Sequence, residues 1–197
     1  MAFKIDGGIL AGGLSSRMGG EDKGLKEFNH QYMVKHVFLA LASQLETVYI
    51  NCNKNHDQYK NISPDICSDS NSEYLGPLSG ILSLITASDA TAMIISPCDT
   101  PKLSPNIIGK LLLETKAAIK ENPNGKFLFA VKENNNFHPL HLCISCSYQD
   151  ELKHSISLGA RRVMQWVKEN NVRWIDFSED SDSFDNINTL NDITNYS

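Results

Sequence analysis

A short apolar run near the start of the chain leads directly into a glycine-rich loop. Residues 9–11 (Ile-Leu-Ala) close the run, and glycines follow at 12, 13, 19, 20 and 24. A buried strand that runs into glycines exposes backbone N–H groups with no side chain in front of them, which suits a polyphosphate. Arg17 and Lys23 add a planar fork and a point charge for phosphate oxygens. Residues 7–25 therefore predict a phosphate-binding loop directly after a first strand.

Two better-known phosphate loops are excluded by spacing. The P-loop needs Gly-Lys-Ser/Thr, but Lys23 stands between Asp22 and Gly24. The dinucleotide fingerprint needs Gly-x-Gly-x-x-Gly, and neither Gly12 nor Gly13 begins that spacing. An ordinary glycine-rich turn is the alternative for the glycines alone. The interleaved arginine and lysine argue against that alternative.

Apolar segments alternate with segments of helical periodicity along the rest of the chain. Strands are predicted at 47–51, 65–68, 91–96, 127–131, 140–144 and 172–177, and helices at 33–45, 77–86, 107–119, 148–157 and 161–168. This alternation predicts parallel strands joined by crossover helices, with helices on both faces of the sheet. We find no repeat or linker that marks a domain boundary, so the expected organisation is a single domain over residues 1–197.

The strand at 91–96 delivers Asp99 to its carboxyl end. Open α/β sheets bind ligands beyond the carboxyl ends of their strands, so Asp99 is expected on the same edge as the first loop. A carboxylate there suits Mg²⁺, which is usually held by one or two carboxylates plus phosphate oxygens. The alternative is that Asp99 caps the next helix, but Ser104, directly before Pro105, is the better cap.

Composition bounds the possible partners. With 197 residues, a net charge of −5 and no broad basic segment, the chain is not expected to bind nucleic acid. No apolar run is long enough to span a bilayer, and residues 1–6 do not form a signal peptide, so we expect no membrane association and a cytoplasmic location. The odd number of cysteines argues against a disulfide framework. Cys143 lies on a predicted strand, where positions three apart point to opposite faces, so its thiol and that of Cys146 could converge only if the strand ends between them. With no second Cys-x-x-Cys pair, this disfavours a zinc or redox role.

The first loop resembles the nucleotidyltransferase signature Leu-Ala-Gly-Gly-x-Ser-x-Arg-Met-Gly-x-x-Lys. With its run Arg-Met-Gly-Gly-x-Asp-Lys-Gly-Leu, it resembles the molybdenum cofactor guanylyltransferase family in particular. Further motifs of that family follow in order, at 76–80 (Gly-Pro-Leu-x-Gly), 97–101 (Pro-Cys-Asp-Thr-Pro), 138–139 (His-Pro), 159–164 (Gly-x-Arg-Arg-Val-Met) and 186–189 (Asn-x-Asn-Thr). The chain departs from the last motif at Leu190, where the family has proline. The resemblance extends from Ile9 to about Asp192.

The resemblance implies a Rossmann-like nucleotidyltransferase domain that transfers GMP from GTP to molybdopterin with Mg²⁺, releasing pyrophosphate. It implies transient contact with molybdopterin-supplying proteins and apo-molybdoenzymes. Catalytic roles fall to Arg17, Lys23 and Asp99, with Asp99 also holding the metal. The residues implied around the nucleotide are Leu10, Ala11, Gly12, Gly13, Lys23, Asn51, Asp69 and Asp99. Those implied around the pterin are Gly76, Gly80, His138, Arg161, Asn186 and Asn188; whether Arg161 or Arg162 contacts the phosphate stays open.

Two other functions remain as alternatives. A sibling enzyme would transfer CMP, but such relatives tend to carry Ala-Ala-Gly where this chain has Ala-Gly-Gly at 11–13. A non-catalytic carrier of the pterin would keep the Arg161 region but could dispense with Lys23 and Asp99. Because both of those residues are present, we rank the carrier below the enzyme.

Overall fold

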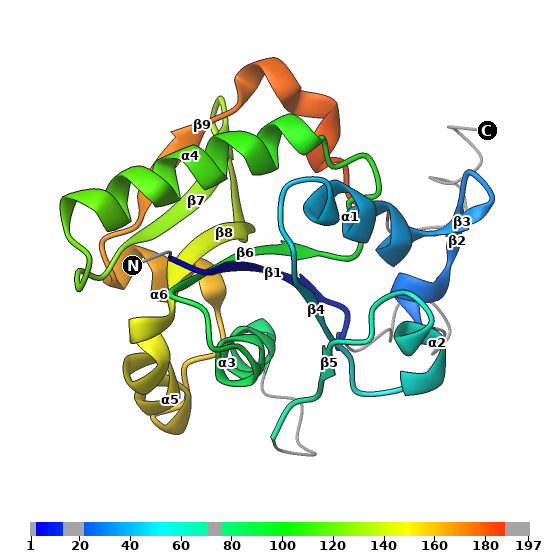
Figure 1. Ribbon diagram of the computed structural model, residues 1–197, viewed down its shortest axis with the longest axis horizontal. Coiled ribbons are helices and arrows are strands. Elements are labelled where there is room, and N and C mark those ends of the chain that lie inside the picture. Colours follow the sequence, from blue (N-terminus) through cyan, green and yellow to red (C-terminus); the bar gives the residue numbers. More distant parts are fainter. Residues whose placement is uncertain (1–2, 14–21, 71–75, 188–197) are drawn as a thin grey trace.

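A seven-stranded sheet forms the centre of the molecule in the computed structural model, which describes residues 3–13, 22–70 and 76–187 (Figure 1). Its strands, in the order in which they lie side by side, are β5 (Ile66–Cys67), β4 (Val48–Asn51), β1 (Ile5–Leu10), β6 (Ala92–Pro97), β8 (Asn136–Ser145), β7 (Leu128–Glu133) and β9 (Arg173–Asp176). All pairings are parallel except those of β8, which runs antiparallel to both β6 and β7. The prediction of a mostly parallel sheet is confirmed.

Helices cover both faces of this sheet, as the alternating pattern predicts (Figure 1). On one face lie α1 (Met33–Ala42) and α4 (Pro105–Glu121); on the other lie α3 (Pro77–Ala87), α5 (Gln149–Ser157) and α6 (Val163–Glu169). The shorter elements are α2 (His56–Lys60), the hairpin of β2 (Glu27–Phe28) and β3 (Gln31–Tyr32), and the 3₁₀ turns η2 (Lys23–Leu25), η3 (Cys146–Tyr148) and η4 (Ser178–Phe184). The sequence analysis did not anticipate η4.

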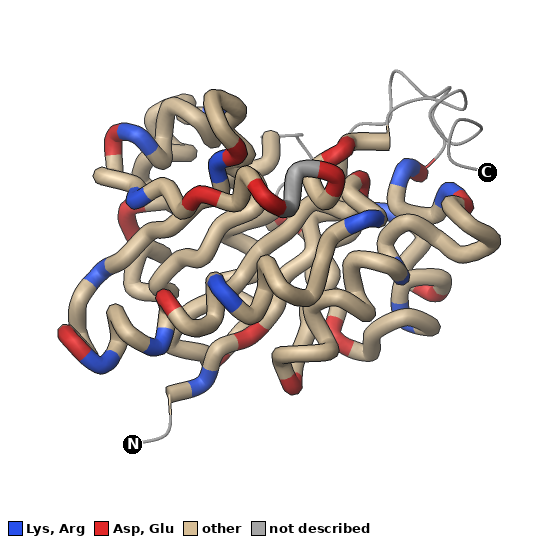
Figure 2. Tube along the Cα trace, turned by 90° about the horizontal axis from the view of Figure 1, so that it is seen from above, with Lys and Arg blue, Asp and Glu red and all other residues tan. Residues whose placement is uncertain are grey.

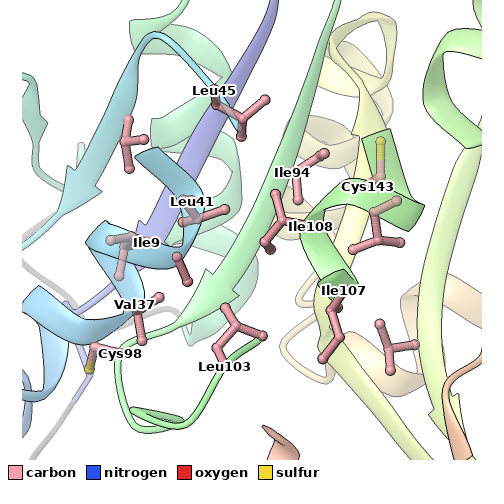
Figure 3. Close-up of a cluster of buried hydrophobic side chains, with 14 of the residues drawn as sticks. Ile9, Val37, Leu41, Leu45, Ile94, Cys98, Leu103, Ile107, Ile108 and Cys143 are labelled. Atoms are coloured by element: carbon pink, nitrogen blue, oxygen red, sulfur yellow. The ribbon is translucent and has the colours of Figure 1, made fainter. Parts of the chain in front are cut away.

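Alternation along the central strand explains why both layers form. In β6, Ile94 packs into the cluster that holds Leu41 and Ile108, so it faces α1 and α4 (Figure 3). Its neighbours Met93 and Ile95 belong to the other cluster, beneath α3 and α6. Since successive side chains of a strand point to opposite faces, a run that is apolar at every position requires a cover on each side.

The helix starts follow local chemistry. The Ser104 hydroxyl accepts a hydrogen bond from the Asn106 N–H at 3.2 Å, and Pro105 occupies the first turn of α4, so the predicted cap is confirmed. Helix α3 begins after Gly76, whose φ of +81° is strained for any side chain, and Pro77 opens its first turn. This leaves Asp99 free of the capping role considered for it.

Three parallel strands end side by side. Leu10, the last residue of β1, pairs in register with Asn51 on one side and Pro97 on the other. The loops that follow β1, β4 and β6 therefore leave the sheet at one edge, where the sequence predicts ligand binding. None of the helices in the described ranges combines the length and apolar character needed to cross a bilayer.

Candidate active site

A pocket of about 250 Å³ lies at the carboxyl ends of β1, β4 and β6. Its lining gathers segments far apart in the chain: Leu10, Ala11, Gly12, Gly13, Lys23, Asn51, Asp69, Gly76, Pro77, Gly80, Pro97, Cys98, Asp99 and Leu140. All eight residues implied for the nucleotide line it. So do Gly76 and Gly80, two of the six implied for the pterin, so the structure brings both groups to one cavity.

An ion pair stands on the wall of this pocket. The Lys23 ammonium, in η2, lies 2.6 Å from Oδ2 of Asp99, which follows β6, and each side chain keeps about a fifth of its surface exposed. The other oxygen of Asp99, Oδ1, is buried, and no donor among the described residues hydrogen-bonds to it. A buried carboxylate oxygen without a donor is costly unless a cation or ligand satisfies it.

That oxygen fits a magnesium ligand. Across the described ranges, no group of three or more His, Cys, Asp or Glu side chains could enclose a metal, so Asp99 is not part of a closed cage of such ligands. Mg²⁺ commonly takes one or two protein carboxylates and completes its shell with water and substrate phosphates, unlike zinc, which needs a cage of several protein ligands. The site therefore suits a metal that arrives with a nucleotide.

Two asparagines hold the carboxylate of Asp69 in the pocket. The Asn51 amide donates to its Oδ1 at 2.9 Å, and the Asn53 amide donates to its Oδ2 at 3.1 Å. Asn53 also donates to the Gly12 carbonyl at 3.3 Å. Sequence reasoning missed Asn53. Its position two residues after Asn51, on the same face at a strand end, was the available signal.

Two glycines make room for the Asn51 amide. A Cβ on Gly12 would lie 2.9 Å from its Oδ1, and one on Gly80 would lie 2.7 Å from the same oxygen. The loop after β1 and the first turn of α3 thus approach Asn51 as closely as backbone allows. Gly13 differs, because a Cβ there would meet no described atom within 4 Å.

Arg161 is not among the described residues that line the pocket, although it packs against Gly76, which is. Its carbonyl oxygen would lie 3.2 Å from a Cβ on Gly76, whereas its guanidinium donates to the carbonyls of Ile156, at 3.0 Å, and Ala160, at 2.8 Å. Ile156 lies in the last turn of α5, where a cation is favoured by the helix dipole, and Ala160 follows the end of that helix. Arg161 and Arg162 both line a second hollow between α5 and α6. The guanidinium of Arg161 is thus hydrogen-bonded to backbone carbonyls of this chain, and its contact with the pterin stays a prediction.

His138 lies beside the pocket rather than in it. Its ring stacks on Phe184 of η4 at 4.7 Å, and its Nε2 is 3.4 Å from Oε2 of Glu133. A second histidine, His141, packs edge-on against Phe184 and contacts the Ser96 hydroxyl through Nδ1 at 3.2 Å. Burial lowers the pKa of His141 to about 3, so its ring is neutral at physiological pH. Sequence reasoning did not single out His141.

A hydrogen bond and an ion pair join the segment that carries Asn186 to the segment that follows β6. The Ile187 N–H donates to the Asp99 carbonyl at 2.9 Å, and Lys102 pairs with Asp185 at 3.1 Å. The Ile187 side chain is buried with Phe28 and Met33. Asn186 is exposed between these two anchored neighbours. Two other predicted site residues, Arg17 and Asn188, lie outside the described residues.

The two cysteines of the Cys-x-x-Cys pair face opposite sides of the sheet, as predicted. Cys143 belongs to the cluster under α1 and α4, where its thiol contacts the Thr115 hydroxyl at 2.8 Å, and Cys146 packs against the other cluster.

Figure 2 shows lysines and arginines spread among acidic residues over several elements of the described chain.

The mostly parallel sheet and the pocket at its strand ends define a nucleotidyltransferase-like α/β domain. Comparison with known proteins agrees with this class. The family described as "MobA-like NTP transferase domain" matches residues 7–173, and the chain belongs to that family. Within it, the chain is 34% identical over 193 residues to a "Molybdenum cofactor guanylyltransferase" from Haemophilus influenzae, covering 98% of this chain and 97% of the relative. A protein of the same name from Shewanella sediminis is 33% identical over 189 residues, with 96% and 93% covered.

Solved structures share the fold at lower identity. The molybdopterin-guanine dinucleotide biosynthesis protein A from Archaeoglobus fulgidus superposes with a TM-score of 0.77 at 20% identity, covering 97% of this chain and 96% of that one. A manganese complex of a Mycobacterium tuberculosis protein superposes with a TM-score of 0.67 at 14% identity, covering 98% and 97%. At these identities the likeness establishes the fold alone.

Proposed function

We propose that the protein transfers GMP from GTP to molybdopterin, releasing pyrophosphate and forming molybdopterin guanine dinucleotide. One observation carries the proposal: in the pocket at the strand ends, the Lys23 ammonium lies beside Asp99, whose buried Oδ1 has no hydrogen-bond donor among the described residues. The relatives' names support the same reaction. We further propose that residues 1–197 act as one domain in the cytoplasm.

The nucleotide half-site consists of the residues around β1 and β4. Backbone N–H groups of the loop after Leu10 and the Lys23 ammonium receive the triphosphate, because both present positive charge to phosphate oxygens. Asn51 and Asp69 are held by each other and line the same cavity, so they offer fixed polar groups to the base or ribose. Arg17 is proposed as a second cationic contact in the loop.

Asp99 would hold Mg²⁺ through its buried Oδ1. When bound, the metal would withdraw charge from the α-phosphate and so favour attack on it. Lys23 keeps Asp99 in place before the nucleotide binds, since the two side chains are 2.6 Å apart. It can then neutralise charge on the departing phosphates.

The reaction itself needs no protein nucleophile. An oxygen of the pterin's terminal phosphate attacks the α-phosphorus of GTP in line, forming one P–O bond as the bond to the β-phosphate breaks. The electron pair of that bond leaves with pyrophosphate. Catalysis then consists of positioning and charge neutralisation by Lys23 and the loop amides.

The pterin is proposed to bind across Gly76, Gly80, His138, Arg161, Asn186 and Asn188. Asn186 supports this placement, because its segment is fastened to the carbonyl of Asp99 and its side chain is exposed. Transient contacts with molybdopterin-supplying proteins and apo-molybdoenzymes would deliver the substrate and receive the product. A CMP-transferring sibling and a non-catalytic carrier remain the rival functions, and a carrier would have no use for the pair of Lys23 and Asp99.

Labelled GTP tests the reaction. With Mg²⁺ and molybdopterin, label in the α-phosphate should appear in the pterin product, whereas label in the γ-phosphate should appear in pyrophosphate. The Asp99→Ala variant should transfer neither label yet still bind molybdopterin. A carrier would bind the pterin and leave both labels in GTP, which would refute the proposal.

A further inference from the structure

We propose that Tyr59 of α2 is a positioning residue for Lys23. Its hydroxyl fixes the carboxylate of Asp22, and Asp22 fixes the turn on which Lys23 stands. The role of Lys23 in phosphate binding rests on the proposed function above. Tyr59 and Asp22 are not among the described residues that line the pocket, so they act on the substrate only through the turn.

The turn η2 is closed by Asp22. Oδ1 of this residue accepts a hydrogen bond from the Gly24 N–H at 3.2 Å, and its carbonyl accepts one from the Leu25 N–H at 3.2 Å. Such a cap satisfies an N–H group that the first turn of a helix leaves without a partner. The direction in which Lys23 leaves the backbone therefore depends on where the Asp22 carboxylate sits.

Residues of α2 and of its N-terminal cap hydrogen-bond to that carboxylate. The Tyr59 hydroxyl donates to Oδ1 of Asp22 at 2.6 Å, and the Asn55 amide donates to Oδ2 at 3.0 Å. Tyr59 is fully buried in the cluster that holds Leu41 and Ile108, so its ring cannot follow the turn of Lys23 if that turn moves. Burial also raises the pKa of Tyr59, which keeps the hydroxyl a donor at physiological pH.

The same hydroxyl explains why position 24 is glycine. A Cβ there would lie 2.6 Å from the Tyr59 oxygen, closer than real Cβ contacts allow, and 3.4 Å from the Cys98 sulfur. Tyr59 therefore touches the turn twice, through Asp22 and against the Gly24 backbone. Cys98 directly precedes Asp99, so Tyr59 and the segment that supplies Asp99 both pack against Gly24, next to Lys23.

Tyr59→Phe removes the hydroxyl and leaves the ring. Removing Lys23 itself should cost on the order of 10²-fold in kcat, like the loss of one transition-state charge donor, so a misplaced Lys23 should cost about tenfold. Tyr148→Phe is the matched control, because its hydroxyl bonds to the Asn170 carbonyl at 3.4 Å, away from the pocket. Three quantities are compared: amide exchange at Gly24, affinity for pyrophosphate alone, and kcat with GTP.

Tyr59→Phe should speed Gly24 amide exchange at least fivefold, weaken pyrophosphate binding three- to tenfold and lower kcat about tenfold, with Tyr148→Phe close to wild type. Unchanged Gly24 exchange would overturn the inference. So would pyrophosphate affinity and kcat within twofold of the Tyr148→Phe values. Pyrophosphate affinity needs no turnover. If wild type transferred nothing from GTP, the proposed function would fail, and the positioning role would still be decided by exchange and pyrophosphate binding.

A second variant guards against an indirect effect of Tyr59→Phe. Gly24→Ala should lower pyrophosphate affinity at least fivefold in the wild-type background, because the new methyl group meets the hydroxyl. In the Tyr59→Phe background it should cost less than twofold more, since the next ring atom, Cε1, lies at an ordinary 3.5 Å. Equal effects of Gly24→Ala in both backgrounds would show that the hydroxyl does not act on this turn.

Discussion

Alanine at position 80 should destabilise the protein, although alanine is the better helix former. Gly80 is buried in α3, and a Cβ there would lie 2.7 Å from Oδ1 of Asn51 and 2.8 Å from Cδ2 of Leu10. Asn51 is 2% exposed and donates to Asp69 at 2.9 Å, so its amide cannot yield without losing that hydrogen bond. The added methyl group of Gly80→Ala would therefore clash with Asn51 and Leu10, two residues of the proposed nucleotide half-site.

The size of the effect follows from three opposing contributions. Replacing glycine by alanine inside a helix gains about 1 kcal/mol. Forcing a methyl group into a filled core costs about 1–3 kcal/mol. Loss of a hydrogen bond to a carboxylate costs about 1.5–3 kcal/mol. The expected net loss in the free energy of unfolding of Gly80→Ala is therefore at least about 1.5 kcal/mol.

Gly109→Ala provides the matched control. Gly109 lies inside α4, and a Cβ there would meet no described atom within 4 Å, so its substitution should stabilise by up to about 1 kcal/mol. Denaturant unfolding of both variants measures the two free energies, and titration with GTP measures the affinity. If Gly80→Ala proved as stable as Gly109→Ala and bound GTP as well as wild type, the close approach at Asn51 would be wrong.

Two further predictions concern the C-terminal segment and the buried histidine. Asp185→Asn should raise KM for molybdopterin several-fold with KM for GTP unchanged, because its pair with Lys102 anchors the segment of Asn186; equal increases for both substrates would contradict this. Because the pKa of His141 is about 3 when folded and about 6.5 when unfolded, only the unfolded chain takes up this proton between those values. Stability due to His141 is thus complete above pH 6.5 and falls by up to about 1.4 kcal/mol per unit as pH drops toward 3. His141→Gln should flatten that slope in denaturant unfolding at pH 7 to 4, and an unchanged slope would refute the assignment.

Sequence reasoning recovered the features that follow periodicity and strand direction. The apolar pattern of β6 and the helical spacing of α1 and α4 were sufficient to predict a covered parallel sheet. The position of Asp99 after β6 and of Lys23 after β1 predicted that they share one edge of the sheet, because both follow parallel strands. Their ion pair is a finding of the structure.

Contacts made by single side chains across the fold could not be predicted in this way. The sequence does not reveal that Arg161 turns its guanidinium to the end of α5, since a basic pair before a helix has no preferred direction. Nor does the spacing between Asp22 and Tyr59 predict their hydrogen bond, which depends on how α2 packs on the core. The 3₁₀ turn η4 was missed because its acidic residues lack a helical apolar pattern; Phe184 at its end provides the anchor.

Base choice tests the central claim most directly. The purified protein is mixed with Mg²⁺, molybdopterin and either GTP or CTP, and release of pyrophosphate is followed over time. The proposed function predicts rapid release with GTP and little with CTP, and none with either nucleotide when Asp99 is replaced by alanine. Release from CTP at an equal or greater rate would contradict guanylyl transfer.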